Sequence, residues 1–386
     1  MNNSKKASNI VVKMMFIFSV VINTICIYSM SITREYTGDA IGSNYNVALY
    51  EAVLFISICF ILYFIINFIP QSKYFDKIKV LDERKVMIAV EVLMVISLFL
   101  KLCGFIFFGY GVAESKSSLD LGFIFRLIPT SVVFMCLLII PEKFNKRYLF
   151  YIILNVSTMI MMGWTGGLFE LFWILIFRFM VKRNSLKYTF LVSFCVFFAF
   201  LVAPYIYSIK FYIRWGADYE FDYLVTLSHL LSRLSFSPMA LYLFENAQDF
   251  VGGVSVLPGF TLFDSVTAVL PRSLLGISID NLETLLVAHF TGAINPGVVY
   301  YLTLPGKIIA SYYISTFDFF VSLFVLVYIL GLLVFFIKAI FGDLMLLPWG
   351  LIIFKFFLSG NYEEPAYIVY GLVIVFALSH VRLRFR

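Results

Sequence analysis

The sequence predicts an all-α, polytopic membrane protein with about ten transmembrane helices and one large loop on the outer face. Of its 386 residues, 62% are hydrophobic and only 13% are charged. A soluble domain averages about 45–50% apolar and about 25% charged residues. The apolar residues fall into runs of the length that a helix needs to cross a bilayer, and the basic residues gather on one side of these runs. The same composition excludes disordered, collagen-like, coiled-coil and nucleic-acid-binding chains.

Ten apolar runs, separated by charged residues, Pro or Gly, are the expected spans. The first is too long for the core of a signal peptide and lacks a small-residue cleavage site, so we expect it to stay in the protein. The fifth and sixth are short and flank a glycine-rich turn at 163–167, which predicts a hairpin. The expected spans are 12–32, 47–69, 86–111, 122–140, 148–163, 167–181, 188–209, 312–337, 344–359 and 366–381.

The positions of Lys and Arg predict the orientation of the chain. Spans that alternate from a cytoplasmic N-terminus place 18 of the 29 Lys and Arg residues inside and seven outside. Cytoplasmic loops of membrane proteins carry such an excess. We therefore expect both termini in the cytoplasm, with seven spans in residues 1–209, a large outer loop in 210–306 and three spans in 307–386.

The outer loop of 97 residues is too apolar and aromatic to be disordered, so we expect it to fold against the membrane. Leucines recur at helical spacing between 224 and 234. Ser237-Pro238 is typical of a helix start, with Ser237 as the cap. Asp280-Asn281-Leu282-Glu283 predicts a second helix that ends before Gly292, with Glu283 capping it.

Ionisable residues inside the expected spans are candidates for a functional site, because each costs roughly 2.5–3.5 kcal/mol at the bilayer centre. Four of them fall in the outer halves of their spans and suggest a polar cavity open to the outer face. Snorkelling, or an ion pair such as Glu170 with Arg126, is the alternative for each. The four cavity candidates are Lys101, Arg126, Glu170 and Lys355.

The arginines of the outer loop suit an anionic ligand. The loop holds eight acidic and four basic residues, so it is not a basic lipid-binding patch. Its arginines stand singly in apolar or aromatic surroundings, where a guanidinium can hold two phosphate oxygens and stay charged. An ion pair with a nearby carboxylate is the alternative for each. The candidates for a pyrophosphate site are Arg214, Arg233 and Arg272.

The candidate proton acceptors of the loop are His289, Glu283 and Asp222. A lone histidine is more often structural. Asp218, Glu220 and Asp222 alternate and could hold a divalent cation, but a solvated connection is the commoner meaning of such a cluster, and no metal is expected. The sequence lacks the motifs of phosphate-binding loops, dinucleotide enzymes, serine hydrolases and zinc proteases.

The chain resembles the Wzy-type O-antigen polymerases, which polymerise oligosaccharide repeat units. The resemblance rests on about ten spans, one large outer loop late in the chain and short motifs in that loop. Where many members follow the Pro-Arg motif with Trp-Pro and Lys, this chain has Leu274-Leu275-Gly276-Ile277. The motifs that carry the resemblance are Arg233-Leu234-Ser235-Phe236, Leu270-Pro271-Arg272-Ser273, Pro296-Gly297 and Thr303-Leu304-Pro305-Gly306 before Tyr312 and Tyr313.

The resemblance implies a glycosyltransferase of the bacterial inner membrane. It would join undecaprenyl-pyrophosphate-linked oligosaccharides at the periplasmic face, in lipopolysaccharide O-antigen biosynthesis. No cofactor is implied, because the donor carries its own leaving group; the implied partners are the lipid-linked glycans, the bilayer and a chain-length regulator, with no nucleic acid. The alternatives are an O-antigen ligase, which shares the donor, and a flippase for lipid-linked oligosaccharides. A flippase is disfavoured because the chain has no internal repeat.

Overall fold

The structure, a computed structural model, is helical throughout the part of the chain that it describes, apart from one isolated bridge between Glu35 and Asn44. It describes residues 2–38, 43–108, 130–141, 146–161, 166–182, 194–195, 197–199, 201–209, 221–269, 281–292 and 301–380. Its α-helices are α1 (Asn2–Thr33), α2 (Leu49–Phe68), α3 (Glu83–Phe108), α5 (Thr130–Ile139), α6 (Lys146–Met161), α7 (Gly166–Lys182), α9 (Tyr223–Arg233), α10 (Ser237–Gly253), α11 (Phe260–Val269), α13 (Leu282–Thr291), α14 (Leu304–Ile314), α15 (Thr316–Phe341), α16 (Leu346–Ser359) and α17 (Glu363–His380).

The predicted all-helical class is confirmed for the described residues, and the ten expected spans stay a prediction. Four helices of the described residues are long and apolar enough to cross a membrane. Helices α16 and α17 are apolar but shorter. The four long segments are Ala7–Thr33, Leu49–Lys77, Glu83–Cys103 and Thr316–Leu344.

The expected span at 312–337 is wrong at its start, because the chain breaks there into two helices. Helix α14 ends at Ile314, and Ser315 adopts an extended backbone before α15 begins. The Ser315 side chain accepts a hydrogen bond from the backbone N–H of Asp318 at 3.0 Å. A serine at this position satisfies one of the donors that a helix start leaves free, so α15 begins as a separately capped helix.

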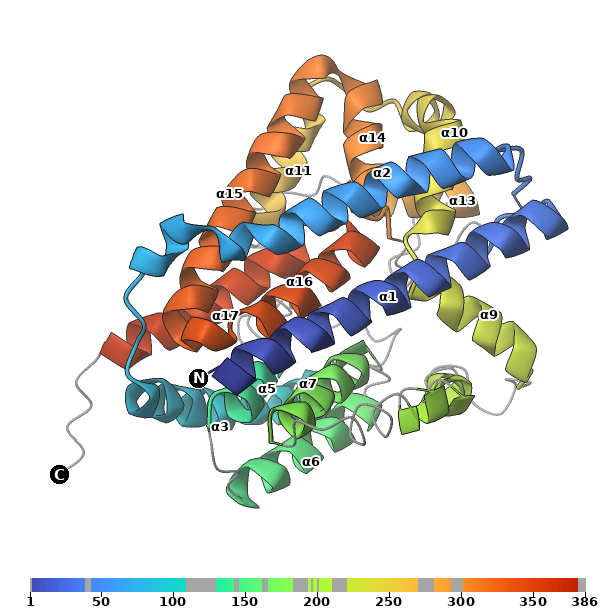
Figure 1. Cartoon of the computed structure of the whole chain (residues 1–386). Coiled ribbons are helices and arrows are strands. Elements are labelled where there is room, and N and C mark those ends of the chain that lie inside the picture. The colour runs from blue at the N-terminus through green and yellow to red at the C-terminus, as the bar shows by residue number, and fades with distance from the viewer. Residues whose placement is uncertain are drawn as a thin grey trace.

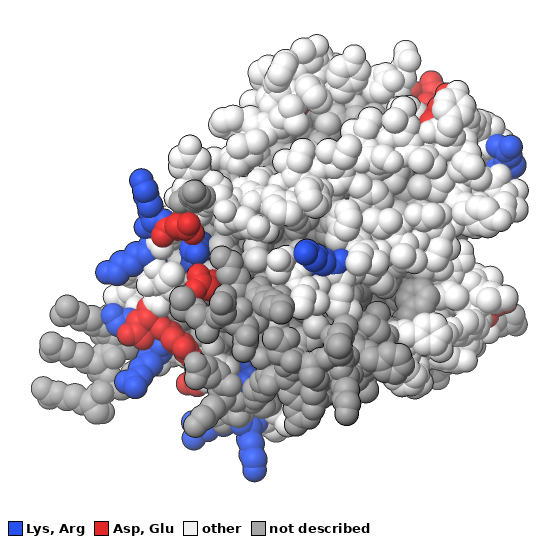
Figure 2. Space-filling view, viewed as in Figure 1, with Lys and Arg blue, Asp and Glu red and all other residues white. Residues whose placement is uncertain are grey.

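The long helices carry large apolar side chains on their outward faces. Phe324 of α15 is 72% exposed and Leu54 of α2 is 64% exposed. Figure 2 shows a broad surface with few charged residues, interrupted by one basic side chain near the middle, while most Lys, Arg, Asp and Glu gather at one end. Soluble monomers rarely expose apolar patches of this extent, whereas lipid is a suitable solvent for them. The surface is that of a membrane-embedded protein.

The described ends of the chain and the helices α10, α13 and α14 lie on opposite sides of the molecule. The start of α1 and the end of α17 lie on the same side, and α10, α13 and α14 lie toward the opposite side (Figure 1). Helix α1 packs against α7 and α16, α17 packs against α3 and α15, and α10 packs along α14. The helices of the predicted outer loop thus pack against long helices, α10 against α1 and α11 against α15.

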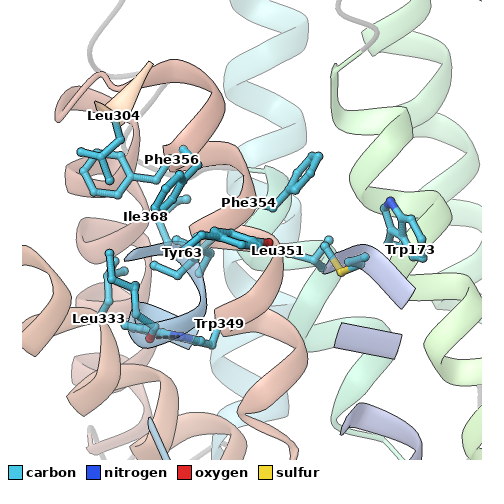
Figure 3. Packing of buried hydrophobic residues seen from close by; sticks show 14 of the residues in the cluster. Tyr63, Trp173, Leu304, Leu333, Trp349, Leu351, Phe354, Phe356 and Ile368 are labelled. Carbon is cyan, nitrogen blue, oxygen red and sulfur yellow. Dashed lines mark hydrogen bonds between the residues drawn. The ribbon is translucent and has the colours of Figure 1, made fainter. Parts of the chain in front are cut away.

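The core between these helices is built from aromatic and aliphatic side chains around α16 (Figure 3). Trp349 is buried there, and its indole N–H donates to the backbone carbonyl of Ile66 at 3.2 Å. That carbonyl lies four residues before Pro70, which has no N–H to donate. The Ile66 carbonyl also accepts the backbone N–H of Ile69, so the tryptophan adds a second hydrogen bond at the end of α2 while it fills the core.

Candidate functional site

Five segments of the chain meet around one small cavity, which we call the Arg233 hollow. Its walls are the end of α9, the start of α10, the α1–α2 connection, the segment before α14 and the last turn of α16. Its volume of about 20 Å³ suits about one water molecule. The hollow is lined by Thr37, Gly38, Ser232, Arg233, Ser235, Pro238, Met239, Tyr301, Thr303 and Leu358.

Arg233 reaches the hollow because it is the last residue of α9. A cation is favourable at a helix C-terminus, where the carbonyl ends point outward. The next helix starts only four residues later with Ser237 and Pro238, and proline suits the first turn because its missing N–H is not needed there. The guanidinium carbon lies 5.5 Å from the ring centroid of Tyr301. A cation–π contact of this kind holds the side chain at the wall.

The backbone of Thr303 is strained at the same hollow. Its φ of 60° and ψ of 155° fall in a region that is essentially limited to glycine and costs about 1–3 kcal/mol. Gly360 lies so close that an added Cβ would be 2.3 Å from the carbonyl carbon of Thr303. On the α1–α2 side, a Cβ added to Gly38 would be 2.6 Å from the Ser232 hydroxyl. The close packing of Gly360 maintains the strain at Thr303, and backbone strain of this kind is typical of functional sites.

Asn23 of α1 holds the α9–α10 turn through hydrogen bonds. It is fully buried, and its carboxamide oxygen accepts the Ser235 hydroxyl at 2.8 Å and the Ser237 N–H at 2.9 Å. Its amide nitrogen donates to the Ser19 carbonyl at 2.8 Å. Helix α10 has no side-chain cap from its own N-cap residue, Phe236. The predicted N-cap at Ser237 is therefore wrong by one residue, because the N-cap is Phe236. The Ser237 N–H donates to the side chain of Asn23 instead.

A second polar cluster, the Lys307 triad, joins α14 to the loop helices. The Lys307 ammonium lies 2.9 Å from a carboxylate oxygen of Asp264 in α11 and 3.0 Å from one of Glu283 in α13. All three side chains are at most 5% exposed. The ammonium also lies 4.4 Å from the ring centroid of Tyr362, just before α17. Buried ions of this kind need close partners, because desolvation of each is costly.

The charges of the triad perturb one another. Burial alone would lower the pKa of Lys307, but Asp264 and Glu283 outweigh burial and raise that pKa above its ordinary value. Burial raises the pKa of Glu283, although Lys307 opposes this shift. Because one ammonium faces two carboxylates, a proton on Glu283 makes the triad electrically neutral. The pKa shift of Glu283 is in that direction.

A third cluster, the Lys355 cluster, lies among the apolar helices. The Lys355 ammonium in α16 is 2.6 Å from a carboxylate oxygen of Glu170 in α7 and 3.1 Å from one of Glu364 in α17. Ser131 of α5 and the apolar side chains of Ile174 and other residues line a small cavity beside it. Lys355 and Glu170, both cavity candidates from the sequence, are thus brought together. The expected alternative partner, Arg126, lies outside the described residues.

The short α16–α17 connection touches all three clusters. Gly360 packs on Thr303 of the Arg233 hollow. Tyr362 lies against Lys307 and exchanges hydrogen bonds with Ser322 of α15, with 2.7 Å between the hydroxyls. Glu364 then binds Lys355. The positions of the three polar clusters are coupled through these few residues.

The structure places the other predicted residues in defined surroundings. Asp222 caps α9, since its carboxylate accepts the Val225 N–H at 3.0 Å. Glu283 was expected to cap its own helix, but Asn281 caps α13 and Glu283 binds Lys307. His289 is on the exposed side of α13, where its ring is 3.1 Å from the Tyr242 hydroxyl.

Lys101 is buried in α3 and donates to the side chain of Asn155 in α6 at 3.2 Å. Arg214, Arg272 and Arg126 lie outside the described residues, as do Asp218 and Glu220 of the predicted cation cluster. Among the described residues, no group of three His, Cys, Asp or Glu side chains is arranged to hold a metal ion.

Sequence reasoning missed several residues that build these clusters. Asn23 is uncharged, although a polar amide inside an apolar span could have marked it. Lys307 entered the sequence argument only as one of the charges that predict the orientation of the chain. Glu364 lies just before an expected span and was not singled out. Nothing in the sequence signals the backbone strain at Thr303.

No protein-family model, curated protein or solved structure matches this chain.

Proposed function

We propose that this protein is a membrane-embedded glycosyltransferase that polymerises polyprenyl-pyrophosphate-linked oligosaccharide repeat units on the outer face of the bacterial inner membrane. The observation that carries the proposal is Arg233. Its guanidinium lies at the end of α9 on the wall of a small polar hollow, among hydroxyl groups and beside a strained backbone. A planar cation in such surroundings suits the diphosphate of a lipid-linked sugar.

The distribution of charge supports the proposed orientation. Exposed basic residues gather at the end of the molecule where both described termini lie (Figure 2). They include Lys77, Lys79, Arg84, Lys85, Lys146 and Arg147. An excess of Lys and Arg marks the cytoplasmic side. The Arg233 hollow then opens at the periplasmic boundary, where the pyrophosphate headgroup of a lipid-linked glycan would lie.

In the proposed reaction, a hydroxyl of the incoming repeat unit attacks the anomeric carbon of the growing chain. The bond from that carbon to the pyrophosphate oxygen breaks, and the polyprenyl pyrophosphate leaves. Arg233 stabilises the negative charge that develops on the leaving oxygen. Arg214 and Arg272 remain further candidates for this role from the sequence. The hollow holds only about one water, so the α9–α10 turn or the Tyr301 ring moves when a diphosphate binds.

An O-antigen ligase would use the same donor and the same pyrophosphate site. The two functions differ in the acceptor, which is a second repeat unit for the polymerase and the lipid A-core for the ligase. A gel of lipopolysaccharide from a deletion strain separates them: loss of a polymerase leaves single repeats on the core, and loss of a ligase leaves none. A flippase would leave the core without repeats as well, and it would make no glycosidic bond.

The role of Arg233 is tested by replacing it in the deletion strain. Arg233→Ala should abolish long-chain polymer while the amount of protein in the membrane stays unchanged. Arg233→Lys should restore only part of the polymer, because an ammonium cannot hold two oxygens in one plane.

Arg34→Ala is the matched control, since Arg34 is an exposed arginine at the end of α1. It should leave the ladder of polymer lengths intact. A normal ladder from Arg233→Ala would refute the assignment of Arg233 to the pyrophosphate.

A further inference from the structure

The Lys355 cluster adjoins the Arg233 hollow along one face of α16. Leu358 lines the hollow, and Lys355 lies three residues earlier, where side chains of a helix are neighbours. Gly360, at the end of the same helix, packs on Thr303 in the wall of the hollow. A sugar attached to a diphosphate in the hollow would therefore lie near the Lys355 cluster.

The charge of the cluster does not suit a second phosphate. One ammonium faces two carboxylates, so the cluster has an excess of negative charge. Carboxylates accept hydrogen bonds from hydroxyl groups and can take their protons. The ligand chemistry that fits is therefore a neutral, hydroxyl-rich group such as a sugar.

The two carboxylates of the cluster differ in access. The Glu170 side chain is 6% exposed, and it holds Lys355 at 2.6 Å. The Glu364 side chain is 38% exposed, and its contact with Lys355 is longer, at 3.1 Å. Glu364 is therefore the carboxylate that an incoming ligand can reach, and Glu170 is the one that keeps the ammonium in place.

Four other carboxylates of the outer region are engaged in structural contacts. Asp264 and Glu283 are buried around Lys307. Asp222 caps α9. Asp318 accepts the backbone N–H groups of Gly259 and Thr261 at 2.8 and 2.7 Å. Each of these carboxylates has a structural role that leaves it poorly placed to exchange a proton with a substrate.

We propose that Glu364 is the general base of the reaction and that Lys355 and Glu170 position it; this inference rests on the proposed function. The carboxylate of Glu364 takes the proton from the acceptor hydroxyl as that oxygen bonds to the anomeric carbon. The bond to the pyrophosphate oxygen breaks with its electron pair, and the departing diphosphate is stabilised at Arg233. The proton then passes to water, so the carboxylate is regenerated. Lys355 holds the Glu364 carboxylate in place through the contact at 3.1 Å.

The test uses the purified full-length chain in lipid nanodiscs, with a synthetic polyprenyl-pyrophosphate-linked repeat unit as the only substrate. The rate of polymer formation is measured across pH for the wild type and for Glu364→Gln. The variant should lose about 10²-fold in kcat, with KM within about twofold of the wild-type value, and the fall in rate at acidic pH should disappear. Glu35→Gln is the matched control, because it makes the same change at an exposed carboxylate of the α1–α2 connection.

Lys355→Met supplies a second readout that a purely structural role would not change. Without the ammonium, the Glu364 carboxylate loses the contact that holds it, so kcat should fall while KM stays within about twofold of the wild-type value, and Lys355→Arg should restore part of kcat. A structural role would reduce the amount of folded protein but leave kcat per folded molecule unchanged.

Wild-type kcat and pH dependence in Glu364→Gln, or wild-type kcat in Lys355→Met, would overturn the role of Glu364 while leaving the polymerase intact. If the wild-type chain forms no polymer from this substrate, the proposed function and this inference fail together.

Discussion

Removal of the ammonium from the Lys307 triad should destabilise the protein strongly. Lys307→Met keeps an unbranched side chain of similar length but leaves Asp264 and Glu283 without the cation that now lies 2.9 and 3.0 Å away. Breaking a buried ion pair by removing one partner costs about 3–5 kcal/mol. We expect a loss of that size in the free energy of unfolding at neutral pH.

The loss should depend on pH. The folded-state pKa of Lys307 is raised, so its stabilising contribution is present below the unfolded pKa of lysine and disappears only as the pH rises through the folded value. The folded-state pKa of Glu283 is also raised, so its protonated form favours the folded chain at low pH. In Lys307→Met the two carboxylates can be neutralised only by protons. Acidification from neutral pH toward the ordinary carboxylate pKa should therefore restore part of the lost stability.

Unfolding of the detergent-solubilised chain, followed by the fluorescence of buried Trp173 and Trp349, measures this effect. Lys338→Met is the matched control, since Lys338 is 3.9 and 3.8 Å from the more exposed Asp76 and Asp343. Pairs of that kind contribute about 0–1 kcal/mol. Adding Asp264→Asn and Glu283→Gln to Lys307→Met should recover most of the loss. Equal losses from Lys307→Met and Lys338→Met would refute the reasoning.

Two further predictions concern the support of the Arg233 hollow. Asn23→Leu should lower the free energy of unfolding by about 2 kcal/mol, because it removes the amide oxygen that accepts the Ser237 N–H and the Ser235 hydroxyl and leaves these two groups only each other as partners. Asn23→Asp, which keeps the acceptor, should lose less in the same thermal unfolding assay. Gly360→Ala should be strongly destabilising and should also abolish polymer, since a Cβ there would lie 2.3 Å from the Thr303 backbone at a φ of 65°. Gly331→Ala in α15 is its control, because nothing lies within 4 Å of an added Cβ, and it should be neutral or stabilising by up to about 1 kcal/mol. A smaller effect at Gly360 than at Gly331 would contradict the close packing of Thr303.

The helices were predictable because their signals are local. Runs of apolar residues and the interruptions between them define α2 and α3 within a few residues of their observed ends, and they define the end of α1. The same holds for α13, where the sequence predicts both the Asn281 region as a start and Gly292 as the end. The start of α1 was wrong, because the helix begins at Asn2 and its first turns are polar. The break at Ser315 was missed because aromatic and aliphatic residues lie on both sides of it, although Ser315, Thr316 and Asp318 mark the start of a new helix.

The candidate site was less predictable because its parts interact over long distances in the sequence. Glu170 and Lys355 were both recognised as charges inside spans, yet their contact with each other and with Glu364 depends on how α7, α16 and α17 pack. Glu283 was recognised as a carboxylate at a helix start, but its partner Lys307 could not be deduced. Arg233 was recognised from its apolar surroundings and from the motif that it begins.

The sequence by itself determined that the chain is a bundle of apolar helices with its basic residues gathered at one end, because composition, helix length and charge are properties of neighbouring residues. Tertiary structure alone decided which polar groups meet inside that bundle. Asn23 reaches Ser235 across 212 positions of the chain, and Lys307 finds two carboxylates on two other helices. A buried polar group needs a partner wherever it lies, and only the packing of the helices determines which partner is within reach.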